Sequence, residues 1–149
     1  MDEDRILREA GVTRGFTRLA RIYRREINHA LAEHGLSDAK AMPVLHVSRL
    51  GEGVRQGVLA EDMGLEGPSL VRLLDQLCAV GLMERRDDPA DGRAKLLHLT
   101  DDGRAMVAII EDALQQLRSR LLREVSDADL EAAIRVFDAL ETATGAGPA

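Results

Sequence analysis

The sequence predicts a mainly α-helical fold with one small β-hairpin, and three observations favour it. The 149-residue chain is 45% hydrophobic and 31% charged but only 2% aromatic, and helix formers dominate over strand formers. Apolar residues recur three and four positions apart along most of the chain. A turn-rich segment at residues 87–93, between two short strand candidates, is the only hairpin candidate. The length fits one domain.

A long amphipathic helix is predicted over residues 12–34, because its apolar positions form one stripe while arginines cover the opposite side. The stripe consists of Phe16, Leu19, Ala20, Tyr23, Ile27, Ala30 and Leu31. Gly35 suits the end of this helix. A second helix is expected from residues 37–38 to about residue 50, with Pro43 bending it or marking its first turn.

Two short helices follow a turn at residues 51–53. The first covers about residues 56–63 and ends at Gly64, and the second begins at residues 67–69 and is stopped by Gly81. Proline is well placed in the first turn of a helix, as Pro68 is here. The predicted apolar stripe of the second helix is Leu70, Leu73, Leu74, Leu77 and Val80.

Two short strands at residues 82–86 and 95–99, joined by a polar loop, form the hairpin candidate. A long helix is then expected from residues 100–103 to about residue 124, with a stripe that includes Ile110, Leu114 and Leu117. Residues 126–129 begin a last helix, and residues 144–149 are predicted to be a disordered tail.

Charge, cysteine content and hydropathy exclude several classes of protein. Cys78 is the only cysteine, so the chain can form neither an internal disulfide nor a cysteine-rich metal site. No signal peptide and no window of roughly 18 apolar residues is present, so we expect a cytoplasmic protein without a membrane partner. The net charge of −6 argues against non-specific coating of nucleic acid, so any DNA contact requires a local basic surface.

The sequence contains no motif that points to catalysis. It lacks a glycine-rich phosphate loop, a nucleophile elbow and a paired metal motif, and its acidic residues are spread over solvent faces. The four histidines form no pair three or four residues apart, which is the usual helical spacing of metal ligands. We therefore expect a non-enzyme that needs no cofactor.

Two short helices joined at Gly64 and followed directly by a hairpin predict a winged helix-turn-helix. The helix over residues 68–80 would lie in the major groove of DNA, with Ser69 and Arg72 near base edges and Gln76 one turn further. Arginine bonded to guanine is the commonest specific contact, which favours Arg72. The alternative that Arg72 and Gln76 only solvate an exposed helix face stays open. Arg93, at the tip of the hairpin, could reach the minor groove, with Asp91 close enough to orient it.

Four segments of the chain resemble the signature of MarR-family regulators, most closely the SlyA-like branch. They are residues 67–77, 81–82, 91–95 and 99–103, and the similarity covers nearly the whole chain. The resemblance implies a homodimer of winged helix-turn-helix protomers that acts on a palindromic operator, with repression as the expected outcome. Residues 1–36 and 104–143 would be dimerisation helices, and residues 37–103 the DNA-binding lobe. From the residues alone, these terminal helices could instead complete a monomeric core.

The resemblance also implies roles for individual residues. Pro68, Ser69, Arg72 and Gln76 would lie at the major groove, Arg93 oriented by Asp91 in the minor groove, and Arg85, Arg86 and Lys95 near phosphates. Residues 66–98 nevertheless contain five Lys/Arg and six Asp/Glu, so this segment is not basic overall. DNA affinity would therefore depend on where the few cations are placed, helped by the basic first helix and by two copies per dimer.

Members of this family often respond to small aromatic carboxylates such as salicylate, bound between the dimerisation helices and the DNA-binding lobe. The candidate ligand residues here are Arg18, Arg21, Tyr23, Met42 and His46, which offer cations beside apolar surface. The chain departs from the SlyA-like pattern at Ala41, where that pattern has an aromatic residue, and at Pro43.

Two alternatives come from other functional classes. The acidic balance favours a helical protein–protein adaptor that has kept the fold and lost DNA binding, although Arg72 and Arg93 argue against it. A thiol-based redox regulator would use Cys78, but its position beside Leu74 and Leu77 favours a half-buried, unreactive thiol.

Overall fold

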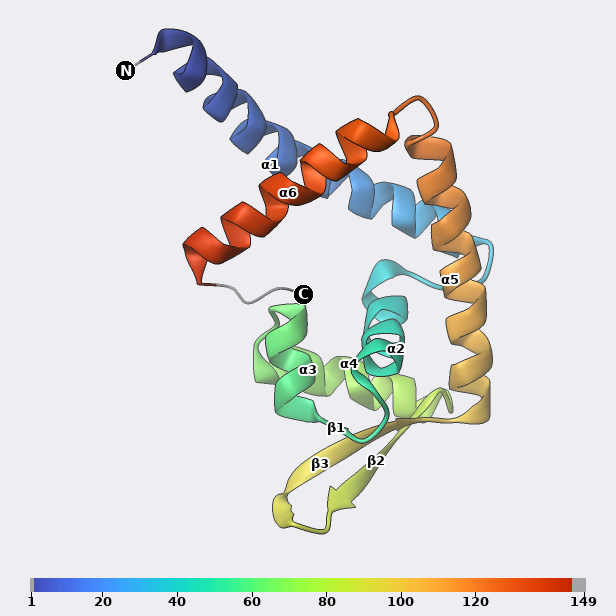
Figure 1. The fold of residues 1–149 in the computed structure, drawn as a ribbon. Helices are drawn as coiled ribbons and strands as arrows, with labels where there is room; N and C mark the ends of the chain where they lie inside the picture. The colour runs from blue at the N-terminus through green and yellow to red at the C-terminus, as the bar shows by residue number, and fades with distance from the viewer. Residues whose placement is uncertain (1, 146–149) are drawn as a thin grey trace. The chain divides into compact units, whose positions relative to one another are not determined.

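Six helices and three strands make up residues 2–145, the part of the chain that the computed structural model describes (Figure 1). In chain order they are α1 (Glu3–Ala32), α2 (Asp38–Leu50), β1 (Val54–Arg55), α3 (Gln56–Met63), α4 (Gly67–Ala79), β2 (Met83–Asp88), β3 (Asp91–Leu99), α5 (Asp101–Leu121) and α6 (Asp127–Thr144). The predicted fold class, mainly helical with a small antiparallel sheet, is confirmed.

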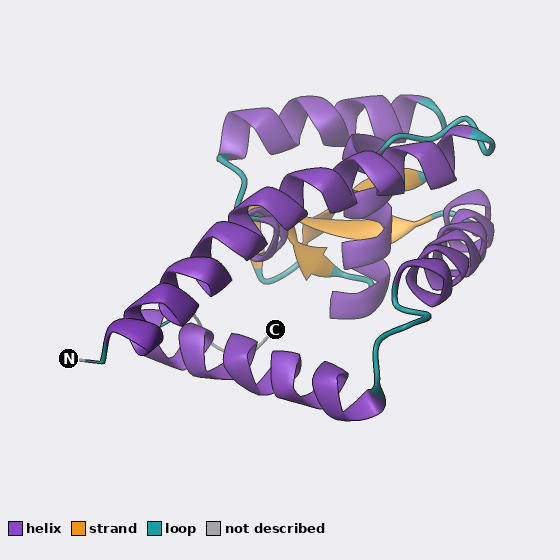
Figure 2. Ribbon diagram, turned by 90° about the horizontal axis from the view of Figure 1, so that it is seen from above, coloured by secondary structure: helices purple, strands orange, loops and turns teal. Residues whose placement is uncertain are grey.

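The sheet has three antiparallel strands in the order β1-β3-β2. Figure 2 shows the strands in orange among the helices. β2, β3 and the turn between them form the predicted hairpin, called the wing below. Sequence analysis missed β1, which pairs Val54 with Leu97 and Arg55 with Leu96. Two residues are too short a strand to produce the alternation by which strands are predicted.

The wing is longer and less regular than the sequence predicted. Asp87 pairs with Lys95 but the next residue, Asp88, pairs with Asp91, so residues 92–94 are left out of the ladder. The polar segment expected to be a loop is therefore mostly strand. Arg93 lies in this irregular part of β3 rather than at the hairpin tip, which corrects the predicted position.

The ends of the terminal helices also differ from the prediction. α1 begins at Glu3 instead of residue 12, and the side chain of Asp2 accepts a hydrogen bond from the Asp4 N–H over 3.2 Å at its start. α6 extends to Thr144, where Gly145 in the left-handed conformation ends it. The remainder of the predicted tail, residues 146–149, lies outside the described residues.

Residues 99–103 form the junction between the sheet and α5, close to the end of α4. The Thr100 hydroxyl donates to the Gly81 carbonyl over 2.6 Å and accepts the Gly103 N–H over 3.0 Å. A Cβ atom added at Gly103 would lie 2.0 Å from the Leu82 carbonyl oxygen. Only glycine lets the first turn of α5 approach the backbone that follows α4 this closely.

One hydrophobic core joins α2, α3, α4, the sheet, the end of α1 and part of α5. Its fully buried side chains include Leu31, Leu45, Leu59, Leu97 and Ile110. Burial of each such side chain contributes about 1.5–3 kcal/mol. This core fixes the position of the sheet and of α4, which carry the candidate site.

The chain divides into two units, Met1–Leu117 and Arg118–Ala149. In the second unit α6 has no buried residue, and its stripe residues Ile134 and Phe137 are 57% and 50% exposed. In the first unit, Phe16 and Leu19 of α1 are also exposed. No helix within residues 2–145 is both long and apolar enough to cross a membrane.

Candidate nucleic-acid interface

The exposed face of α4 carries the predicted major-groove residues. Leu70, Leu74 and Leu77 are buried and fix one side of the helix against the core. Residues on the opposite side of a helix must then face solvent. All four candidates do so and form one surface, the α4 face: Pro68, Ser69, Arg72 and Gln76.

Arg72 on the α4 face and Arg93 on the wing are exposed, and neither guanidinium pairs with a carboxylate anywhere in residues 2–145. Asp91 Oδ1 accepts the backbone N–H of Arg93 over 3.0 Å. Asp91 therefore orients the Arg93 main chain, rather than the guanidinium. The two arginines are free to meet an external anion.

Arg85, expected near phosphates, is engaged inside the protein. Its Nη1 donates to Asp75 Oδ1 over 2.5 Å, and its Nη2 donates to the Val71 carbonyl over 3.1 Å. The Nε atom is buried and has no hydrogen-bond partner in the described part of the chain. Arg85 thus ties β2 of the wing to α4 and is not available as a free cation.

The other two predicted phosphate residues also have carboxylate neighbours. Arg86 pairs with Glu84 on the same strand, and Lys95 pairs with Asp87 across the β2–β3 ladder. These pairs are exposed, so they are weak and can open toward another anion. Of the five cations between residues 66 and 98, only Arg72 and Arg93 have no carboxylate partner among the residues that the structure describes.

A buried carboxylate, Asp88, organises the turn of the wing. Its Oδ1 accepts the Ala90 N–H over 2.9 Å, and its Oδ2 lies 2.7 Å from Nη2 of Arg55. The Ala90 N–H lowers the pKa of Asp88, burial opposes this, and Arg55 lowers the pKa further, so the carboxyl stays ionised. Sequence analysis did not single out Arg55 or Asp88.

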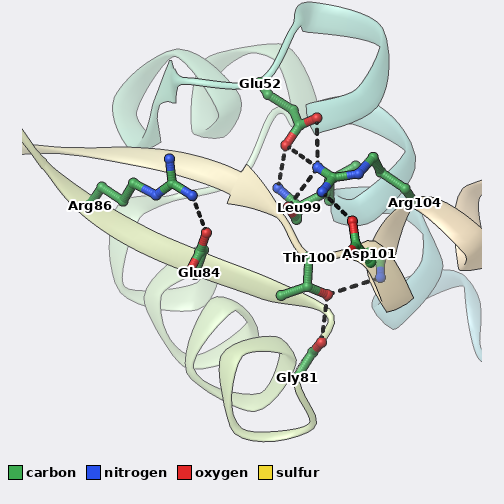
Figure 3. A network of polar contacts seen from close by, with 9 residues as sticks. Glu52, Gly81, Glu84, Arg86, Leu99, Thr100, Asp101 and Arg104 are labelled. Atoms are coloured by element: carbon green, nitrogen blue, oxygen red, sulfur yellow. Dashed lines mark hydrogen bonds and ion pairs between the residues drawn. The ribbon is translucent and has the colours of Figure 1, made fainter.

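A polar network connects the turn before β1 to the start of α5 (Figure 3). Glu52 accepts the Leu99 N–H over 3.0 Å, and its two carboxylate oxygens lie 2.8 and 3.0 Å from Nη1 of Arg104. Arg104 also donates to the Leu99 carbonyl and to Asp101. Burial raises the pKa of Glu52, but the hydrogen bonds from Leu99 and Arg104 outweigh it and leave the pKa lowered.

The network fixes the turn before β1 and the end of β3 to the base of α5, and its Glu52–Arg104 pair joins residues 52 positions apart. The hydrogen bonds that Arg104 donates to Asp101 and Glu52 raise the pKa of Arg104, so its charge is secure. Local patterns in a sequence give no signal for such distant partners, and neither residue was predicted.

A cavity of about 640 Å³ lies among α1, α2, α3 and α4. It contains three of the five predicted ligand residues, Tyr23, Met42 and His46, whereas Arg18 and Arg21 do not line it. The cations that do line it are Arg24 and Arg72. Helical spacing could have indicated Arg24 from the sequence, because it lies four residues after Ala20 and three before Ile27. Both of these residues belong to the predicted apolar stripe, and both line the cavity.

Two polar pairs sit in the wall of this cavity. His46 Nδ1 lies 2.5 Å from Asp62 Oδ2 and joins α2 to α3, and Arg24 Nε lies 3.6 Å from Asp38 Oδ2. Ser69, Arg72 and Gln76 of α4 line the same cavity. One helix therefore contributes to both the cavity and the candidate DNA surface.

Cys78 is half-buried and packs against the core. Within residues 2–145, no group of three or more His, Cys, Asp or Glu side chains could hold a metal ion.

Comparisons with known proteins agree with the winged helix-turn-helix arrangement of the structure. Residues 34–94 match the MarR family. A MarR-family transcriptional regulator from Rhodococcus sp. RHA1 is 25% identical, with a TM-score of 0.78 over 89% of this chain and 93% of that one. Staphylococcus aureus MarR in complex with salicylate and kanamycin is 16% identical, with a TM-score of 0.83 over 95% of each chain.

A mutant MarR from E. coli in complex with operator DNA is 21% identical, with a TM-score of 0.78 over 94% of this chain and 99% of that one. The chain thus has the winged-helix fold of MarR regulators, and its central segment matches that family in sequence. Assignment to the SlyA-like branch stays a prediction.

Proposed function

We propose that the chain acts as a MarR-family transcriptional regulator that binds operator DNA as a homodimer. The observation that carries the proposal is the placement of Arg72 and Arg93. The three other cations between residues 66 and 98 are paired with carboxylates, and these two are exposed without a partner within residues 2–145. They occupy the α4 face and the wing, the two elements with which a winged helix contacts DNA.

In this proposal α4 enters the major groove with its N-terminal end toward the bases. Arg72 bonds a guanine, Gln76 suits an adenine, and the free N–H groups of the first turn favour a phosphate. Arg93 reaches into the adjacent minor groove, where the negative potential attracts arginine. Arg86 and Lys95 exchange their exposed carboxylate partners for phosphates, while Arg85 keeps α4 and the wing together.

A second copy of the chain covers the exposed apolar faces of α1 and α6. A helix such as α6, which has no fully buried residue within residues 2–145, gains little stability from its own chain, because helical stability in proteins comes mostly from packing. Residues 1–36 and 104–143 then form the dimerisation region, and residues 37–103 the DNA-binding lobe. A two-fold dimer presents two α4 helices, which matches a palindromic operator.

A small anionic aromatic ligand fits the cavity next to α4. Tyr23 and Met42 supply apolar surface, and Arg24 and Arg72 supply positive charge for a carboxylate. A salicylate complex of the Staphylococcus aureus MarR supports this ligand class. Because Arg72 lines the cavity, a bound anion competes with DNA for the same guanidinium. Binding of the ligand therefore releases the repressor from its operator.

The protein–protein adaptor remains the second candidate, because the net charge is −6 and most cations of the DNA-binding segment are neutralised. A regulator selects a particular DNA sequence, whereas an adaptor does not. We would incubate the full chain with a random-sequence DNA pool, sequence the retained duplexes and weigh the complex by native mass spectrometry.

If the chain is a regulator, the selection should enrich a palindrome with half-sites about one helical turn apart, and the mass should show two chains per duplex. Retention of DNA without any enriched sequence, or no retention at low salt, would favour the adaptor.

A further inference from the structure

Arg55 occupies a position where arginine is locally unfavourable. It is the N-cap residue of α3, and its side chain makes no capping hydrogen bond. Serine, threonine, aspartate and asparagine are preferred at this position because their oxygen atoms accept helix N–H groups. A guanidinium has no acceptor, and its charge opposes the positive end of the helix dipole. A residue that breaks local rules indicates a tertiary role.

That role is contact with the buried carboxylate of the wing. Arg55 Nη2 lies 2.7 Å from Asp88 Oδ2, and the Asp88 side chain is only 8% exposed. A buried carboxylate requires a compensating charge or hydrogen bonds. Arg55 supplies the charge, and the Ala90 N–H supplies a hydrogen bond to the other oxygen. The pair therefore links the start of α3 to the turn of the wing.

The same turn sets the course of the chain through Arg93. Asp91 follows Ala90 directly and accepts the Arg93 N–H over 3.0 Å, within the stretch of β3 that leaves the ladder. Residues outside the ladder lack the interstrand hydrogen bonds that would otherwise fix them. Arg55 and Arg93 also line one groove of about 460 Å³, together with Gln56 and Lys95. The position of Arg93 thus depends on how the turn is held.

We propose that Arg55 and Asp88 form a brace that holds the wing turn against the start of α3 and thereby positions Arg93 for DNA. The proposal rests on the proposed DNA-binding function. Arg55 is a positioning residue, because it acts through the turn and through Arg93 rather than on DNA itself.

A double-mutant cycle separates positioning from direct contact. The variants are Arg55→Met, Arg93→Ala and their combination, and the readout is anisotropy of a labelled duplex that the wild-type protein selects from a random pool. The control is Arg49→Met, since Arg49 pairs with Glu111 over 3.0 Å and is 52% exposed, against 51% for Arg55, but does not touch the wing.

We expect Arg93→Ala to weaken binding about tenfold in the wild type and less than about twofold in the Arg55→Met background. Arg49→Met should bind like the wild type. Additive effects of Arg55→Met and Arg93→Ala would overturn the proposal, because Arg55 would then contact DNA independently. Unchanged binding of Arg55→Met would also overturn it.

Amide hydrogen exchange tests the brace without DNA. The N–H groups of Ala90 and Arg93 should exchange faster in Arg55→Met and in Arg55→Met/Asp88→Asn than in the wild type or Arg49→Met. The double variant removes the pair without leaving a buried charge alone, so it provides the answer if Arg55→Met does not fold. Unchanged exchange overturns the brace. If the wild type selects no DNA sequence, the proposed function is wrong. The amide exchange of Ala90 and Arg93 still tests whether the brace holds the wing turn.

Discussion

Arg85 Nη1 lies 2.5 Å from Asp75 Oδ1, so a strand of the wing is joined to α4 by an ion pair. The next residue, Arg86, pairs with Glu84 on its own strand. The Arg85 side chain is 23% exposed and that of Arg86 58%. Neighbours of the same residue type therefore have different roles.

Arg85→Met should destabilise the folded chain by about 1–3 kcal/mol, because two hydrogen bonds that join β2 to α4 are lost, each with a net contribution of about 0.5–1.5 kcal/mol. Arg86→Met should change the free energy of unfolding by less than about 0.5 kcal/mol, as expected for an exposed pair. Urea unfolding followed by circular dichroism measures both. Equal losses in the two variants would contradict the assignment of Arg85 as the link to α4.

The Glu52–Arg104 network predicts a specific dependence of stability on pH. The pKa of Glu52 is below its ordinary value of 4.5, so ionised Glu52 stabilises the folded state at pH values above 4.5. This contribution is lost as the pH falls through the lowered pKa of the folded protein. The difference in unfolding free energy between the wild type and Glu52→Gln should be constant near neutral pH and should shrink below pH 4.5. A difference that does not change with pH would show that the network does not hold Glu52 ionised.

Sequence reasoning predicted the elements whose signals are local. α3 and α4 were placed within a residue or two, because Gly64 and Gly81 end helices and a leucine stripe marks the buried side of α4. The exposure of Arg72 and Gln76 follows from the same stripe. The short strand β1 could not be predicted, since its pairing with Leu96 and Leu97 depends on a strand about 40 residues away.

The polar part of the site was harder to predict for a physical reason. Which carboxylate pairs with which arginine depends on the register of β2 against β3 and on its irregularity between Asp87 and Asp88. A count of charges over residues 66–98 therefore suggested a neutral segment. In the structure three of the cations are paired, and Arg72 and Arg93 have no carboxylate partner within residues 2–145. Arg24 lines the cavity, whereas the predicted Arg18 and Arg21 do not, for a similar reason. The exact rotation of α1 about its axis decides which arginines face the cavity.

The exposed apolar face of α6 predicts that the chain dimerises. Phe137→Glu should convert the wild-type dimer, twice 16.3 kDa, into a monomer or an unfolded chain, because it places a charge in the interface. Arg135→Glu adds the same side chain outside the Ile134–Phe137 stripe and should remain dimeric. Sedimentation velocity and circular dichroism give both readings. A wild-type chain that sediments as a monomer at micromolar concentration would contradict the dimer.

The cavity predicts binding of salicylate through Arg24. Saturating salicylate should raise the melting temperature of the wild type, because a ligand that binds only the folded state stabilises it. Arg24→Ala should reduce this increase, whereas Arg18→Ala, which changes an arginine outside the cavity, should keep it. If Arg18→Ala loses the effect and Arg24→Ala retains it, the ligand binds elsewhere.

The most direct test of the central claim is a salt titration of DNA binding by the wild type, Arg72→Ala and Arg93→Ala, on the selected duplex and on a scrambled one. We predict that Arg72→Ala costs about 1–3 kcal/mol on the selected duplex and much less on the scrambled one. Arg93→Ala should weaken binding to both and reduce the salt dependence by about one ion. Binding by both variants at wild-type strength would contradict the account, because the two unpaired arginines would then not be the DNA contacts.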